Sequence, residues 1–238
     1  MKRKCLIIGA NGGIGHAIMK KLLQERYEII GTYHKSKEHV ELFQSNEKVK
    51  LYHLDLNNFD KEEISKLDLR GITDVIFASG KESVKNILNC NENEMFEQYN
   101  INVFSPLLLV QFILQKYGEK LRNIIFISSS AAFELKSSNG VYALSKACLC
   151  NLVKMLDCEL RTKGIRVNCV TPGWCETEMT ERVAKAKGSS INAIKNNKLD
   201  NRLVQVEELA EICLFLLSDL AINIHGQFIG IDVPEKEL

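Results

Sequence analysis

Short apolar runs alternate with longer amphipathic stretches along nearly the whole sequence. The apolar runs predict strands at 4–8, 28–32, 48–53, 74–77, 123–127, 166–170 and 227–231. The helical periodicity between them predicts helices at 14–25, 37–44, 61–67, 92–117, 142–161 and 206–218. This alternation is typical of a parallel sheet with helices on both faces. The 238 residues therefore predict one α/β domain over 1–238, a doubly wound parallel sheet of about seven strands.

Charge and hydropathy argue against several classes of protein. The net charge is +1, which gives no reason to expect a nucleic-acid partner. No apolar run reaches the roughly 18 residues of a membrane span, and the run at 5–8 is too short for a signal peptide. The eight cysteines are scattered without a Cys-x-x-Cys pair, so we expect reduced thiols and no metal site. A cytoplasmic protein is the expectation.

Three glycines follow the first predicted strand and open the first predicted helix. Gly9, Gly13 and Gly15 have the spacing G-x-x-x-G-x-G. A tight strand-to-helix turn of this kind brings backbone N–H groups and the helix N-terminus against a dinucleotide pyrophosphate. The alternative is a tight turn that binds no ligand.

The end of the second predicted strand bears on which nucleotide would bind. Residues 31–38 read GTYHKSKE, with His34 and Lys35 in place of the acidic residue that holds the ribose 2′-OH of NAD. The sequence therefore favours NADP(H), with NAD(H) as the alternative. Lys35 could instead be a solvated loop lysine. A basic residue at position 12 would strengthen the preference for NADP(H), so Gly12 argues against a strong preference.

Tyr142 and Lys146 lie four residues apart at the start of a predicted helix, within GVYALSKACL. This spacing places both side chains on one helix face. A nearby ammonium and a cationic nicotinamide ring would both favour the phenolate, so we expect a lowered pKa for Tyr142 and a role in proton transfer. Taken alone, the two residues could equally be amphipathic side chains of a surface helix.

Several motifs, taken in order, resemble the short-chain dehydrogenase/reductase family. They are GANGGIG at 9–15, IIFISSSAA at 124–132, YALSK at 142–146 and VNCVTPGWCETEMT at 167–180. The resemblance spans nearly the whole chain, is greatest to the 3-oxoacyl-[acyl carrier protein] reductases, and implies a Rossmann-like strand order 3-2-1-4-5-6-7. The sequence departs from the family pattern at Ile8, at the FASG turn of 77–80, and at 232–234, where Asp-Val-Pro replaces Asp-Gly-Gly.

The resemblance implies a catalytic set of Asn102, Ser129, Tyr142 and Lys146. Ser129 is selected among three consecutive serines because it precedes Tyr142 by 13 positions, and Asn102 fits its motif better than Asn100. Tyr142 would be the general acid/base, Ser129 would orient the substrate oxygen, and Asn102 would hold a water beside Lys146. The cofactor-binding residues implied are Gly9, Asn11, Gly12, Gly13, Ile14, Gly15, His34, Lys35, Asp55, Leu56, Ala78, Ser79, Gly80, Tyr142, Lys146, Pro172, Gly173, Cys175 and Thr177.

The implied activity is NADPH-dependent reduction of a ketone, such as a 3-oxoacyl thioester of fatty acid biosynthesis, to an alcohol. The alternatives are a dehydrogenase of a sugar, steroid or other small secondary alcohol, and a non-catalytic nucleotide-sensing protein. A flap around 178–203 would cover the substrate, and its polar stretch 181–200 suggests either a mobile flap or a poorly ordered loop. Lys120 and Lys163 are candidates for docking an acyl carrier protein, or are ordinary surface lysines.

The predicted helices over 102–117 and 142–161 are apolar around most of their circumference. Leu107, Leu108, Leu109, Phe112 and Ile113 contribute in the first, and Leu149, Leu152, Val153 and Leu156 in the second. A helix that covers one sheet face needs only one apolar stripe, so a second buried face against another subunit is expected. A homodimer or homotetramer is therefore the expectation, with deeper burial inside the domain as the alternative.

Overall fold

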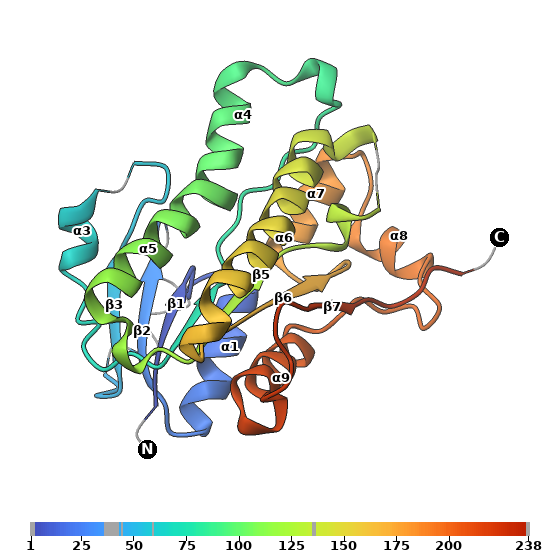
Figure 1. Cartoon of the computed structure of the whole chain (residues 1–238). Coiled ribbons are helices and arrows are strands. Elements are labelled where there is room, and N and C mark those ends of the chain that lie inside the picture. The colour runs from blue at the N-terminus through green and yellow to red at the C-terminus, as the bar shows by residue number, and fades with distance from the viewer. Residues whose placement is uncertain (1–2, 36–42, 44, 59, 135–136, 237–238) are drawn as a thin grey trace.

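A computed structural model describes residues 3–35, 43, 45–58, 60–134 and 137–236 (Figure 1). Seven parallel strands form one sheet in the order β3-β2-β1-β4-β5-β6-β7. They are β1 (Lys4–Ile8), β2 (Glu28–Tyr33), β3 (Val49–His53), β4 (Asp74–Phe77), β5 (Asn123–Ile127), β6 (Arg166–Pro172) and β7 (Phe228–Ile231). The predicted Rossmann-like sheet and its strand order are confirmed.

Helices cover both faces of this sheet (Figure 1). One face carries α3 (Lys61–Ser65), α4 (Glu92–Tyr99), α5 (Ser105–Tyr117) and α6 (Gly140–Leu160), and the other carries α1 (Gly13–Gln24) and α9 (Val206–Leu217). Two short helices, α7 (Glu178–Ala186) and α8 (Ile191–Asn196), lie beyond the sheet edge near the C-terminus. No helix among the described residues is long and apolar enough to cross a membrane.

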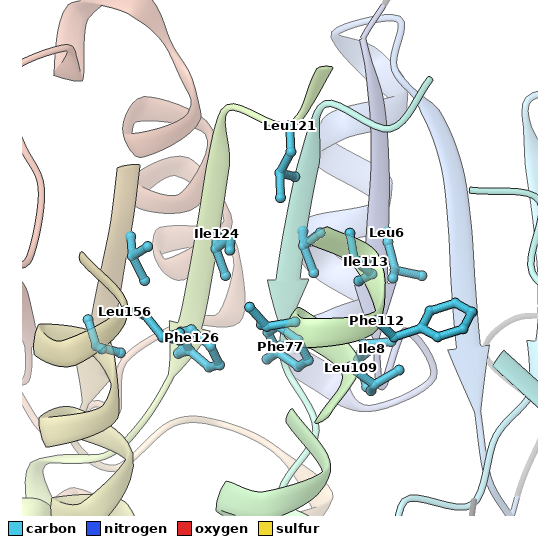
Figure 2. Close-up of a cluster of buried hydrophobic side chains, with 14 of the residues drawn as sticks. Leu6, Ile8, Phe77, Leu109, Phe112, Ile113, Leu121, Ile124, Phe126 and Leu156 are labelled. Carbon is cyan, nitrogen blue, oxygen red and sulfur yellow. The ribbon is translucent and has the colours of Figure 1, made fainter. Parts of the chain in front are cut away.

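Two hydrophobic layers form because side chains alternate between the faces of each strand. In β1, Leu6 and Ile8 face the α5–α6 layer, whereas Cys5 and Ile7 face the α1–α9 layer. Both faces are buried, which explains the uninterrupted apolar run of this strand. Figure 2 shows the first layer, where Phe77 and Phe126 stack with ring centroids 4.7 Å apart.

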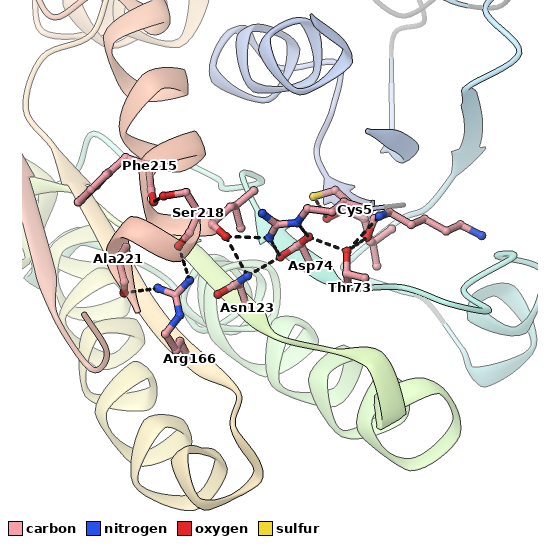
Figure 3. A network of polar contacts seen from close by, with 12 residues as sticks. Cys5, Thr73, Asp74, Asn123, Arg166, Phe215, Ser218 and Ala221 are labelled. Atoms are coloured by element: carbon pink, nitrogen blue, oxygen red, sulfur yellow. Dashed lines mark hydrogen bonds and ion pairs between the residues drawn. The ribbon is translucent and has the colours of Figure 1, made fainter. Parts of the chain in front are cut away.

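Polar side chains form a buried network at the edge where the strands begin (Figure 3). Asp74 is fully buried and accepts hydrogen bonds from Arg3 at 2.7 Å and from Asn123 and Thr73. Arg3 and Asn123 also donate to the Leu217 carbonyl at the end of α9. This network joins β1, β4, β5 and α9 at the edge opposite to the one where the strands end.

The structure differs from the predicted elements in two places. The predicted helix 92–117 is interrupted by a π turn over Asn100–Phe104. The stretch 181–200 does not form the expected loop but contributes to α7 and α8, whose first turns are capped by the hydroxyls of Thr177 and Ser190. The predicted helix 37–44 lies outside the described residues except at position 43.

Candidate active site

An open cleft of about 1110 Å³ lies beyond the ends of the parallel strands. Its walls come from the segments that follow β4, β5 and β6, from the start of α6, and from the α7–α8 region. This is the usual place for a ligand in a doubly wound sheet. The cleft brings together these predicted site residues: Ile14, Ala78, Ser79, Gly80, Ser129, Tyr142, Lys146, Pro172, Gly173, Cys175 and Thr177.

The glycine turn borders this cleft and leaves no room for a side chain at Gly9 or Gly15. Gly9 has a φ of +84°, and a Cβ there would lie 2.8 Å from the Ser79 nitrogen. A Cβ on Gly15 would lie 2.1 Å from the Gly9 carbonyl oxygen. A Cβ on Gly13 would lie 3.1 Å from the Thr177 methyl, so the turn also approaches the start of α7. Gly9 and Gly15 are therefore required by close packing at this turn, and a side chain at Gly13 would be crowded.

The same turn fits a dinucleotide pyrophosphate. The N-cap of α1 is Gly12, no side chain caps the helix, and no acidic residue occupies its first turn. Its first N–H groups and the positive end of the helix dipole therefore suit an anion. The adjacent Ser79 hydroxyl is buried without a hydrogen-bond partner among the described residues, as expected for a group that a ligand would satisfy.

Ser129, Tyr142 and Lys146 meet on the wall formed by β5 and α6. The Lys146 Nζ atom lies 5.8 Å from the centre of the Tyr142 ring and donates a 3.0 Å hydrogen bond to the Ile127 carbonyl. A Cβ on Gly80 would come within 3.2 Å of this Nζ atom. The FASG turn thus keeps its glycine because a side chain there would displace Lys146.

Burial changes the pKa of both helix residues. It raises the pKa of Tyr142 to about 12, partly opposed by a hydrogen bond with Ser129. It lowers the pKa of Lys146 to about 8. Loss of hydration therefore dominates the pKa of Tyr142 in the protein alone. The lowering expected beside both an ammonium and a cationic nicotinamide ring stays a prediction.

The three consecutive serines have different partners. Ser128 is buried and donates to the Lys146 carbonyl at 3.1 Å. Ser129 accepts a hydrogen bond from the Ala131 nitrogen at 3.2 Å, which leaves its own proton available to a ligand oxygen. The contact between Ser129 and Tyr142 supports the choice of Ser129 as the substrate-orienting residue.

Asn102 lies in the π turn and is buried. Its side-chain amide pairs with both backbone groups of Lys81, at 3.0 and 3.1 Å, and donates to Ser145 at 2.9 Å. It therefore braces the segment after β4 against α6. The water-mediated link from Asn102 to Lys146 stays a prediction.

His34, Lys35 and Asp55 lie at the ends of β2 and β3, outside the cleft proper. His34 and Lys35 are exposed, and the His34 Nε2 atom lies 3.7 Å from an Asp55 oxygen. Burial alone would raise the pKa of Asp55, but hydrogen bonds from Asn57 and Asn58 bring it below its ordinary value. Asp55 is thus a charged group that fixes the turn after β3, and Leu56 beside it is buried.

Three of the remaining predicted residues are held in place by packing around the Pro172–Gly173 turn and the glycine turn. A Cβ on Gly173 would lie 2.1 Å from the Asp232 carboxylate. Thr177 accepts from the Thr180 nitrogen as the N-cap of α7. Burial raises the pKa of the Cys175 thiol to about 12, so it stays protonated. All eight cysteines are free thiols.

Sequence reasoning missed several residues that line the cleft, among them Asn139, Trp174, Lys187, Lys198, Asp232 and Glu235. Trp174 follows the predicted Pro-Gly turn directly and could have been found from that motif. Lys198 and Asp232 meet across 34 residues of sequence, and no local pattern indicates such a contact.

The structure places Lys120 and Lys163 away from this cleft. They precede β5 and β6, which start side by side at Asn123 and Arg166. The cleft lies where these parallel strands end. The two lysines therefore give no support to a carrier protein docked at the cleft mouth.

Comparisons with known proteins agree with this geometry. A family model described as enoyl-(acyl carrier protein) reductase matches residues 9–233. The 3-oxoacyl-[acyl-carrier-protein] reductase FabG of Thermotoga maritima is 32% identical, over 96% of this chain and 95% of the relative. The "Dehydrogenase/reductase SDR family member 6" of Aquarana catesbeiana is 30% identical, over 94% of this chain and 93% of the relative. A solved structure of 4-hydroxyisoleucine dehydrogenase complexed with NADH superposes with a TM-score of 0.86 at 25% identity, over 98% of both chains.

Proposed function

The chain belongs to the short-chain dehydrogenase/reductase family of NAD(P)-dependent oxidoreductases, and we propose that it reduces a ketone to a secondary alcohol with NADPH. The observation that carries the proposal is the meeting of Ser129, Tyr142 and Lys146 in a cleft bordered by an uncapped, glycine-lined helix N-terminus. When bound, the reduced nicotinamide would supply the hydride to the carbonyl carbon.

The chain's own residues supply the proton and hold the substrate oxygen. Ser129 donates a hydrogen bond to the carbonyl oxygen and orients it. Tyr142 gives its phenolic proton to the same oxygen as negative charge develops there, and takes it back in the reverse reaction. Lys146, fixed by the Ile127 carbonyl, lies beside Tyr142 and stabilises its phenolate.

NADP(H) is the proposed cofactor because His34 and Lys35 are both exposed at the end of β2. Each can approach a 2′-phosphate. Neither is a carboxylate, the group that would accept a hydrogen bond from the free ribose 2′-OH of NAD. NAD(H) is the alternative.

Two substrate classes are proposed. The similarity to a 3-oxoacyl-[acyl-carrier-protein] reductase supports an oxoacyl thioester. The charged side chains of Lys198, Asp232 and Glu235 in the cleft favour a small polar ketone or alcohol, and the similarity to 4-hydroxyisoleucine dehydrogenase supports this second class.

A Tyr142→Phe variant tests the proposed function. The wild type is assayed with a panel of acyl thioesters, sugars and simple ketones. It should reduce at least one of these compounds, and kcat/KM should be higher with NADPH than with NADH. Tyr142→Phe should lower kcat/KM for the best substrate by about 10²- to 10⁴-fold, because the proton donor is lost. NADPH affinity, measured by fluorescence titration, should change little.

Tyr117→Phe is the matched control, because Tyr117 lies at the end of α5 on the opposite edge of the molecule. Turnover that survives in Tyr142→Phe would remove Tyr142 from the reaction. Tight NADPH binding without oxidation by any carbonyl compound would favour a nucleotide-sensing protein.

A further inference from the structure

Lys198 is a buried ammonium in the wall of the cleft that also holds Tyr142. Its side chain is 3% exposed, and none of the proposed proton-transfer steps uses it. A buried charge is costly unless it is paired, so a lysine at this depth needs a specific acceptor.

The backbone around Lys198 is held firmly in place by the C-terminal tail. Lys198 forms an antiparallel bridge with Glu235. The Leu199 nitrogen donates to the Pro234 carbonyl and the Lys236 nitrogen donates to the Asn197 carbonyl, both at 2.8 Å. Lys198 thus lies where the residues after α8 are hydrogen-bonded to the tail that follows β7.

The acceptors of Lys198 lie at long distances. Its Nζ atom is 3.3 Å from both Asp232 oxygens and 3.8 Å from Glu235 Oε1. Charge-assisted hydrogen bonds are usually 2.7–2.9 Å long. On the same helix end, Lys195 reaches Glu176 at 2.5 Å. The ammonium of Lys198 therefore retains capacity for a closer acceptor.

The two carboxylates beside Lys198 differ in exposure and in their distance from its Nζ atom. Asp232 stands against Gly173 and accepts from the Val233 nitrogen at 2.8 Å. Glu235 is 60% exposed and lies beyond hydrogen-bond distance of Nζ. A ligand carboxylate could take the outer place while Glu235 turns to water, which leaves the charge around Lys198 unchanged.

We propose that the substrate carries a carboxylate remote from its carbonyl group, and that Lys198 binds this carboxylate beside Asp232. The inference rests on the proposed function, because it places the reacting carbonyl at Ser129 and Tyr142 of the same cleft. It assigns the substrate to the oxo acids and their hydroxy acid products.

The test compares unbranched oxo acids of increasing length with their methyl esters, using NADPH and the full chain. At least one acid should exceed its ester in kcat/KM by about 10- to 100-fold, the range of one charge-assisted hydrogen bond. Lys198→Met should bring the acid-to-ester ratio close to one. The saturated carboxylate of the same length should inhibit the wild type competitively, and Lys198→Met much more weakly.

Lys195→Met is the matched control, because it removes the same charge three residues away without touching the cleft. Glu235→Gln is a second variant at an exposed position and should lower the KM of the preferred acid several-fold by removing a competing carboxylate. If Lys198→Met fails to fold, the KM of the preferred acid in Glu235→Gln tests the inference by itself.

Three results would overturn the inference while leaving the proposed function intact. They are esters reduced as well as every acid, an acid preference that persists in Lys198→Met, and a KM for the acid that does not fall in Glu235→Gln. If no acid, ester or other ketone oxidises NADPH in the presence of the protein, the proposed function itself is overturned, and the inference with it.

Discussion

Burial shifts the ionisation of the two cleft residues to which the proposed proton transfer assigns a role, Tyr142 and Lys146. The pKa of Tyr142 is raised to about 12 and that of Lys146 is lowered to about 8. Both shifts favour the neutral form because each polar group has lost its hydration. The folded chain therefore holds a lysine whose charge is unfavourable at neutral pH, which is the kind of strain expected at a functional site.

A Lys146→Met variant should reveal this cost as a pH-dependent difference in stability. Below pH 8 the lysine is charged in both folded and unfolded chains, and folding carries the full penalty. Between about 8 and the ordinary value of 10.5 the unfolded chain binds more protons, so wild-type stability rises with pH. The free energy of unfolding of the wild type relative to Lys146→Met should increase by about 2.5 kcal/mol from pH 7 to pH 10.

Urea unfolding at four pH values between 7 and 10 measures this difference. Lys154→Met, at an exposed position of the same helix, serves as the control. A difference that stays constant or falls as pH rises would show that Lys146 is not penalised by burial.

At the scale of elements, the polar network around Asp74 links three strands to the end of a helix. Arg3 of the N-terminal segment, Asp74 of β4 and Asn123 of β5 converge there, and two of them also hold the last turn of α9. Removing one partner of such a buried pair leaves the other charge uncompensated.

Asp74→Asn should therefore destabilise the fold by about 3–5 kcal/mol, measured by urea unfolding at pH 7. Asp68→Asn is the matched control, because Asp68 pairs with Lys50 and Arg70 at the surface. Surface pairs contribute only about 0–1 kcal/mol. Equal losses in the two variants would contradict the structural importance of the buried network.

The central strands β1, β4 and β5 were predictable because both of their faces are buried, so each carries an uninterrupted apolar run after its first residue. The sequence contains the residues that cap α7 and α8, Thr177 and Ser190. The polar composition of 181–200 nevertheless led to the prediction of an irregular segment instead of two helices. The π turn at Asn102 follows from tertiary contacts with Lys81 and Ser145, and helix periodicity does not reveal such contacts.

At the scale of the whole molecule, the apolar surface predicted to face another subunit is formed mostly by other residues than those expected from the sequence. Leu109, Phe112, Ile113, Leu149, Val153 and Leu156 are buried within the domain. Large apolar side chains are nevertheless exposed on α4, the π turn, α5 and α6: Phe96, Phe104, Leu108, Leu144 and Met155. We propose that a second copy of the chain covers them.

Light scattering should give the wild type two or four times the mass of one chain. A Leu108→Glu, Met155→Glu double variant should have a lower assembly mass, because it places charges in the apolar contact. Leu220→Glu is the control, since Leu220 is 85% exposed but follows α9 on the other face. A wild type that stays monomeric at micromolar concentration would contradict the proposed assembly.

The proposed catalytic residues Ser129, Tyr142 and Lys146 were brought together from sequence because they lie in local motifs with fixed spacing. The charged group of Lys198, Asp232 and Glu235 was not, because it forms only when the end of α8 meets the tail after β7. Local motifs thus indicated the chemistry, whereas the groups that would select a substrate depend on long-range contacts.

The pairing of the C-terminal tail with residue 198 has a practical consequence for handling the protein. The tail after β7 runs beside the end of α8 as far as Lys236, whereas β1 begins at the far edge of the sheet (Figure 1). A purification tag fused to this tail would be attached close to the junction that holds Lys198. Expression vectors for assays should therefore carry the tag before Met1.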